Sequence, residues 1–139
     1  MSTSEKNFDL MLLGSEVRRL FPSMYGAYLF GSATTEHMRT DSDLDIAILD
    51  LEPLSPTAVL TLKGILSEKF RRDSDIVDLY RADSVTAAQI VTTGIEICSV
   101  TPLKMAEFET MAMSRYAILN EDRAEILEEI NRTGRIYGG

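Results

Sequence analysis

The sequence predicts a single α/β domain. Short apolar runs of five to seven residues alternate with longer stretches in which apolar residues recur every three to four positions. The first pattern is typical of strands and the second of amphipathic helices. The length of 139 residues suits one domain with its own hydrophobic core, and neither an internal repeat nor a low-complexity linker divides the chain.

The first elements alternate between helix and strand. Apolar spacing predicts a helix over Asn7 to Leu20, which Pro22 ends. Tyr25 to Phe30 is expected to form a short strand, broken by Gly31-Ser32, and the alternation over Asp43 to Leu49 predicts a second strand.

The middle of the chain repeats this order. Pro53 and Pro56 stand where a helix begins, and its apolar positions continue to Phe70. Arg71 and Arg72 are interpreted as a solvated end of that helix, and Asp75 to Tyr80 as a third strand. The next helix is expected to be capped by Asp83-Ser84 and closed by Gly94.

The last third is expected to be mostly helical. Ile95 to Val100 is predicted to be an edge strand, and Leu103 to Ile130 follows a helical pattern that Asn120 to Asp122 is expected to divide in two. We therefore predict a core over residues 1–100 and a C-terminal helical extension of the same domain over residues 101–139.

Charge and composition narrow the function. The net charge of −8 argues against a nucleic-acid substrate, because proteins that hold phosphate backbones are usually basic. No apolar run approaches the roughly 20 residues that span a bilayer, and the N-terminal residues lack the pattern of a signal peptide. Cys98 is the single cysteine, which predicts a cytoplasmic protein without an intrachain disulfide.

The second strand carries the most informative pair of residues. Side chains alternate along a strand, so Asp43 and Asp45 are expected to project from one face with backbones about 7 Å apart. Two carboxylates at that spacing repel each other unless they are solvated or hold a cation. Magnesium prefers oxygen ligands and usually combines one or two carboxylates with phosphate oxygens. The pair therefore predicts a magnesium site.

A glycine turn precedes this pair. Gly31 follows an apolar strand directly, and a residue without a Cβ lets the backbone approach a phosphate closely. Ser32 adds a hydroxyl donor. Together with Asp43 and Asp45, this turn is expected to bind a nucleoside triphosphate with its magnesium.

A third carboxylate would complete a two-metal site. Asp78 is the preferred candidate, because Val77 and Leu79 would face the core and leave Asp78 on the opposite face. That face carries Asp43 and Asp45 if the two strands are neighbours. Asp75 is out of phase with Asp78, and its position at the start of the strand predicts a role in the turn.

These motifs resemble those of a known family. Gly31-Ser32, ten further residues and Asp43-Leu44-Asp45 are similar to the signature of the polymerase-β-like nucleotidyltransferases. Tyr28-Leu-Phe-Gly-Ser32 and Val77-Asp-Leu79 resemble the minimal nucleotidyltransferases (MNT) of the MntA antitoxin type. Many members have an arginine and a glycine shortly after Gly-Ser; this chain has Ala33 to Glu36 there, and Arg39 is a candidate for the positive charge.

The resemblance implies a fold, ligands and a partner. It implies a mixed sheet flanked by helices, with C-terminal helices following. ATP and two magnesium ions would be held at Gly31, Ser32, Asp43 and Asp45, with Asp78 at the third acidic position. It also implies a HEPN-domain ribonuclease toxin as partner, which such antitoxins silence by transferring AMP to a tyrosine.

Besides a regulatory nucleotide sensor, two other functions remain open from the sequence. One is a nucleotidyltransferase acting on small molecules, similar to the aminoglycoside enzymes. The other is a non-catalytic module that neutralises a toxin by binding alone. About forty residues follow the predicted core, which is little for a domain that encloses a small acceptor, so an acceptor on a partner protein is favoured.

Overall fold

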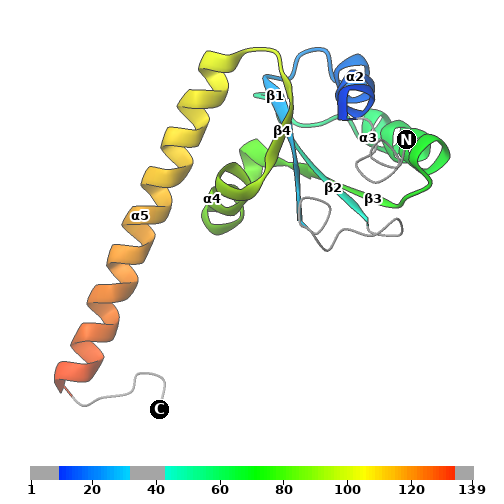
Figure 1. Cartoon of the computed structure of the whole chain (residues 1–139). Helices are drawn as coiled ribbons and strands as arrows, with labels where there is room; N and C mark the ends of the chain where they lie inside the picture. The colour runs from blue at the N-terminus through cyan, green and yellow to red at the C-terminus, as the bar shows by residue number, and fades with distance from the viewer. Residues whose placement is uncertain (1–9, 32–42, 134–139) are drawn as a thin grey trace.

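A four-stranded mixed sheet forms the centre of the computed structural model, which describes residues 10–31 and 43–133 (Figure 1). The strand order is β3-β2-β1-β4. β1 runs antiparallel to both β2 and β4, whereas β2 and β3 are parallel. The predicted α/β class and the mixed sheet are confirmed. The strands are β1 (Gly26–Phe30), β2 (Leu44–Leu49), β3 (Ser74–Asp78) and β4 (Ile95–Ser99).

Two helices cover one face of the sheet, α2 (Leu10–Leu20) and α3 (Pro56–Phe70). Alternate residues of β1 and β2 point into this layer and form the first core with apolar residues of both helices. The buried members are Leu13, Val17, Phe21, Met24, Ala27, Leu29, Leu44, Ile46, Ile48, Leu62 and Leu66. This layer fixes β1 and β2 side by side.

The other face is covered by α4 (Ser84–Thr93) and the first part of α5 (Pro102–Thr133). The remaining strand positions point here, and Tyr28 donates a hydrogen bond from its hydroxyl to the Glu109 carboxylate on α5. Burial, followed by the Glu109 and Glu96 charges, raises the pKa of Tyr28. This second core contains Tyr28, Ala47, Leu49, Leu79, Ala87, Ile90, Met105, Phe108 and Ala112.

The helix starts follow local sequence. Ser55 caps α3 by accepting a hydrogen bond from the Ala58 N–H at 3.2 Å, and Pro56 occupies the first turn. Asp83 caps α4 by accepting from the Thr86 N–H at 2.8 Å, and Gly94 ends that helix. The predicted helix start at Pro56 and the predicted cap of α4 at Asp83 are confirmed; the cap at Ser55 was not predicted.

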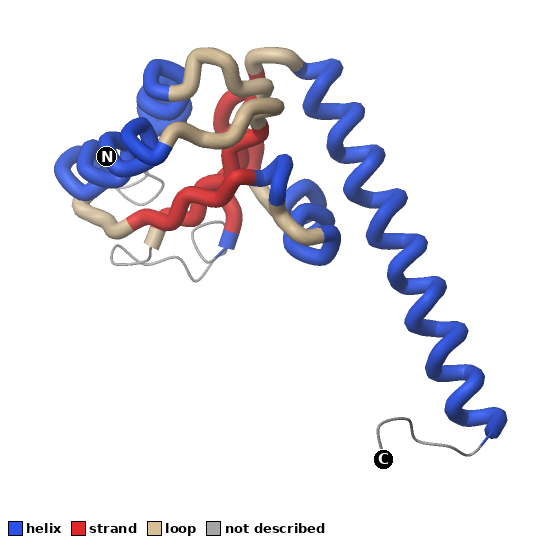
Figure 2. The backbone as a smooth tube through the Cα atoms, turned by 180° about the vertical axis from the view of Figure 1, so that it is seen from behind, coloured by secondary structure: helices blue, strands red, loops and turns tan. Residues whose placement is uncertain are grey.

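The end of the chain differs from the expectation. α5 is one continuous helix of 32 residues, so the predicted break at Asn120 to Asp122 is wrong. The segment contains neither glycine nor proline after Pro102, and asparagine or aspartate costs at most about 0.7 kcal/mol inside a helix. The far half of α5 extends away from the rest of the molecule (Figure 2). In the described part of the chain, no helix has the length and apolarity to span a bilayer.

A buried carboxylate links α2 to α3. Glu16 is only 6% exposed, and its carboxylate accepts hydrogen bonds from Lys69 of α3 and, at 2.6 Å, from Arg19. The hydrogen bond from Lys69, and then that from Arg19, lower the pKa of Glu16. The stabilisation is therefore complete above the ordinary carboxyl pKa and is lost as the pH falls through the lowered pKa.

We predict that Glu16→Gln lowers the free energy of unfolding by about 1–2 kcal/mol near pH 7, because two charge-assisted hydrogen bonds to a buried acceptor are weakened. Urea unfolding measured from pH 7 down to pH 3 checks this. The difference between wild type and variant should shrink as the pH falls, and a difference that is constant over this range would contradict the assignment.

Candidate active site

Asp45 lies where three strands meet. It is the second residue of β2, half-buried, and its register partners are Phe30 at the end of β1 and Asp75 near the start of β3. Neighbours in register on adjacent strands project to the same face of a sheet. The Asp45 and Asp75 side chains therefore lie on the face of the sheet that carries α4, at the end away from the α5 connection.

Gly31 ends β1 directly beside this carboxylate. Its φ is +81°, a left-handed conformation that side chains other than hydrogen rarely adopt. A Cβ added to Gly31 would overlap the Asp45 carboxylate. Glycine is thus required twice at this position, for the turn and for the close approach of Asp45. Ser32 and Arg39, the other residues of the predicted phosphate turn, lie outside the described residues.

The acidic side chains here oppose one another electrostatically. Burial first, then the charge of Asp75, then that of Asp43 raise the pKa of Asp45. Asp43 itself precedes β2 and is exposed. The predicted proximity of Asp43 and Asp45 is thus reflected in the electrostatics of Asp45, with Asp75 as the stronger influence. The mutual repulsion of these three carboxylates would be relieved by a cation bound at this end of the sheet.

The structure does not bring Asp78 to this group. β2 and β3 are neighbours, but Asp78 pairs with Ile48, three positions further along than the Asp45–Asp75 pair. Strand alternation then turns the Asp78 side chain to the opposite face. The expectation that Asp78 shares the face of Asp45 is therefore wrong, and the assignment of Asp75 to a turn missed its position. The sequence did contain a signal for Asp75: Asp45 and Asp75 each stand at the start of a strand, and the starts of parallel neighbouring strands lie side by side.

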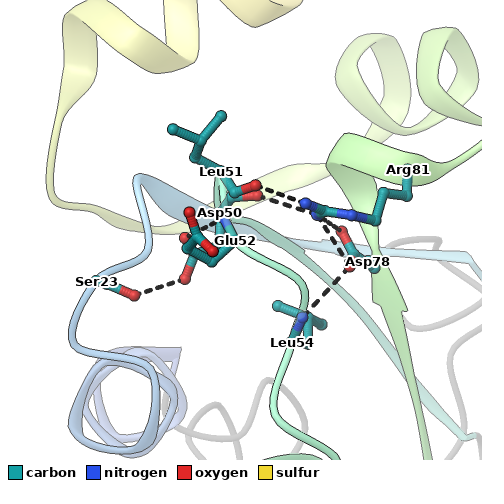
Figure 3. Close-up of polar contacts among 7 residues, drawn as sticks. All are labelled: Ser23, Asp50, Leu51, Glu52, Leu54, Asp78 and Arg81. Atoms are coloured by element: carbon teal, nitrogen blue, oxygen red, sulfur yellow. Dashed lines mark hydrogen bonds and ion pairs between the residues drawn. The ribbon is translucent and has the colours of Figure 1, made fainter.

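Asp78 instead fixes the loop that follows β2 (Figure 3). Its carboxylate accepts from the Leu54 N–H at 3.4 Å and from Arg81 Nη1 at 3.2 Å. Arg81 comes from the 3-10 helix η2 (Leu79–Arg81), and its Nη2 donates to the Leu51 carbonyl at 2.5 Å. These contacts give Asp78 a structural role at the far end of the sheet.

The described residues do not form a complete metal cage. Within residues 10–31 and 43–133, no three acidic, histidine or cysteine side chains are grouped closely enough to hold an ion by themselves. A pair of carboxylates that relies on phosphate oxygens for its other ligands is the arrangement magnesium usually adopts. Asp43 and Asp45 fit that description, and the raised pKa of Asp45 is the effect a bound cation would reverse.

The mixed sheet, with Asp45 on β2 beside the Gly31 turn, is the arrangement expected of a nucleotidyltransferase. Residues 6–102 match the family described as polymerase beta, nucleotidyltransferase, and the chain belongs to this family. It is 31% identical over 114 residues to the protein adenylyltransferase MntA of Shewanella oneidensis, an alignment that covers 82% of this chain and 81% of the relative.

Solved structures agree with this placement. A mutant MntA–HpeT toxin–antitoxin matches with a TM-score of 0.73 and 27% identity over 88% of this chain and 98% of the other. A toxin–antitoxin with AMP-PNP gives a TM-score of 0.68 at 28% identity over 84% and 97%. The complex of a tri-AMPylated S. oneidensis HEPN toxin with MNT antitoxin gives 0.67 at 27% identity over 94% and 98%.

Substitutions of the two acidic residues of β3 should have different effects: that of Asp75 on nucleotidyl transfer, and that of Asp78 on stability. We predict that Asp75→Asn lowers nucleotidyl transfer by roughly 100-fold or more, since it removes a carboxylate that would hold a metal ion at the reacting phosphate, while leaving the fold intact. Asp78→Asn should retain transfer within about threefold but lose about 1 kcal/mol of stability, because its hydrogen bonds to Arg81 lose their ionic character. Transfer rates and urea unfolding of both variants check this. A loss of transfer in Asp78→Asn, with transfer retained in Asp75→Asn, would show that Asp78 and not Asp75 belongs to the active site.

Proposed function

We propose that this protein is a magnesium-dependent protein adenylyltransferase that transfers AMP from ATP to a tyrosine hydroxyl of a HEPN ribonuclease toxin and thereby neutralises it. The observation that carries the proposal is the Asp43-Leu44-Asp45 segment at the start of β2, which lies beside the Gly31 turn and has Asp75 in register with Asp45. The relatives named for protein adenylylation, AMP-PNP and a tri-AMPylated toxin support it. The single cysteine and acidic composition fit a cytoplasmic protein.

Three carboxylates would hold the metal ions. Asp43 and Asp45 are proposed to bind two magnesium ions, with Asp75 replacing Asp78 as the third acidic ligand. Magnesium, when bound, neutralises the phosphate charge and favours attack at the α-phosphorus. Gly31 admits the polyphosphate close to the backbone because it has no Cβ, and Ser32 is proposed from the sequence as a further donor.

The reaction is an in-line displacement. The tyrosine oxygen of the acceptor forms a bond to the α-phosphorus of ATP while the bond from that phosphorus to the bridging oxygen breaks. Pyrophosphate leaves with the electron pair, and the hydroxyl proton passes to Asp75 or to solvent. Positioning of the two reactants and neutralisation of charge supply most of the acceleration.

An acceptor on a partner protein fits the exposed surface of α5. Two apolar side chains on its projecting part are exposed, Ile118 by 59% and Leu127 by 61%. Met113, which is 41% exposed, lies nearer the core, beside α4. Exposed apolar side chains on a helix half that no other layer covers are available for contact with a partner protein. A hetero-oligomer with the toxin is therefore proposed, in line with the complexes of the relatives.

Replacing Asp45 by asparagine should raise the stability of the fold and abolish the binding of magnesium. Because folding raises the pKa of Asp45, the folded protein holds that proton more tightly than the unfolded chain, and stability falls as the pH rises through the interval between the two pKa values. We predict that Asp45→Asn melts at a higher temperature than wild type at pH 7 without magnesium. Magnesium with ATP should raise the melting temperature of wild type only. A variant that is stabilised equally by magnesium-ATP would contradict the metal site.

The transfer itself is tested by intact-mass measurement of a HEPN-type toxin after incubation with this protein, ATP and magnesium. We predict stepwise gains of AMP with wild type, and a rate at least roughly 100-fold lower with the Asp43→Asn, Asp45→Asn double variant. The double variant Glu52→Gln, Glu68→Gln removes the same charge from exposed positions outside the site and outside α5, and should match wild type.

The other outcomes distinguish the rival functions. A double variant that still neutralises the toxin in cells, without any gain in toxin mass, indicates neutralisation by binding alone. AMP transfer to an aminoglycoside but not to the HEPN-type protein indicates a small-molecule enzyme. Either result would overturn the proposed function.

A further inference from the structure

A polar hollow of about 420 Å³ lies beside the acidic pair. It is lined by Asp43, Ser67 of α3, and the turn Arg71-Arg72-Asp73 that joins α3 to β3. Arg72 is 7% exposed, so its side chain is part of the wall, whereas Arg71 is exposed to solvent. Asp43 belongs to both the hollow and the proposed metal site, which makes the hollow a continuation of that site.

The turn holds its two arginines in a fixed place. The Leu44 N–H donates to the Asp73 carbonyl at 2.9 Å, which ties the turn to the start of β2 next to Asp43. Arg71 adopts the left-handed conformation, with φ 57° and ψ 39°, at the end of α3. Glycine is the residue that takes this conformation without strain, so the chain keeps an arginine where its backbone is disfavoured. Strain of this kind is often retained at functional positions.

The strand order places the hollow on the side of the acceptor. β1 with Gly31 lies on one side of β2, and β3 with the preceding arginine turn lies on the other. If the triphosphate of ATP lies against the Gly31 turn, as proposed above, the β3 side of β2 is left for the acceptor. Arg71 is exposed on this side, next to the buried Arg72. A guanidinium group suits a phosphate because the two form charge-assisted hydrogen bonds.

We infer that the Arg71–Arg72 hollow is an acceptor-side subsite for the phosphodiester of an AMP group that the toxin already carries. The inference rests on the proposed function. A toxin gains one phosphodiester with each AMP, and the solved complex of an MNT antitoxin with a tri-AMPylated toxin shows that a modified acceptor is held by a related protein. The subsite favours addition to the modified toxin over the first addition to the unmodified one.

The experiment is a time course of toxin mass with wild type, Arg71→Gly, Arg71→Lys and the control Lys63→Ala, which removes a charge from the exposed side of α3. Arg71→Gly suits the left-handed turn, so it should fold at least as stably as wild type. It is expected to keep the first addition within about twofold and to slow later additions about tenfold, the loss of one charge-assisted hydrogen bond to phosphate. Arg71→Lys should restore part of the later rate, and Lys63→Ala should match wild type.

Four results would overturn the subsite. A first addition slowed as much as the later ones, with a raised KM for ATP, assigns the arginines to the phosphates of ATP. An equal slowing with unchanged KM assigns them to the unmodified toxin. Unchanged kinetics throughout, or a wild type that stops at one AMP, removes the subsite altogether. A wild type that adds no AMP at all contradicts the proposed function instead.

Discussion

Repulsion among carboxylates at one end of the sheet is the constraint around which the site is arranged. Asp45 is half-buried, pairs with Asp75 across β2 and β3, and also experiences the charge of Asp43, so its pKa is raised. This cost is tolerated because two hydrophobic cores, one on each face, hold the strands in register. The packing of the rest of the fold therefore keeps the repelling carboxylates together, in an arrangement suited to bind a cation together with a phosphate.

The same constraint explains the neighbours of Asp45. Gly31 is the residue that can end β1 so close to the carboxylate, since any Cβ would overlap it. At the opposite end of β3, Asp78 forms an ion pair with Arg81 and accepts a hydrogen bond from Leu54 in the loop after β2. Two aspartates on one short strand thus have separate roles, set by position along the sheet and by face. The domain division at residue 100 stays a proposal, although the structure shows α5 packing on the second core.

Much of the fold could be predicted because it is encoded locally. Periodicity identified the strands, and Ser55-Pro56 and Asp83 mark helix starts by their own hydrogen bonds. The choice between Asp75 and Asp78 could not be made locally, because it depends on the register between β2 and β3, which packing of the whole sheet decides. The continuity of α5 through Asn120 has a different cause: weak helix formers do not end a helix when stronger helix formers continue it in sequence on both sides.

The central claim is that Asp45 and Asp75 form one electrostatic unit, and carboxyl carbon NMR of Asp45 tests it most directly. Without magnesium, the pKa of Asp45 should lie above the ordinary aspartate value, should fall in Asp75→Asn, and should be unchanged in Asp78→Asn. Magnesium should lower it in the wild type. An Asp45 that titrates at its ordinary value, or that responds to Asp78 and not to Asp75, would contradict the account.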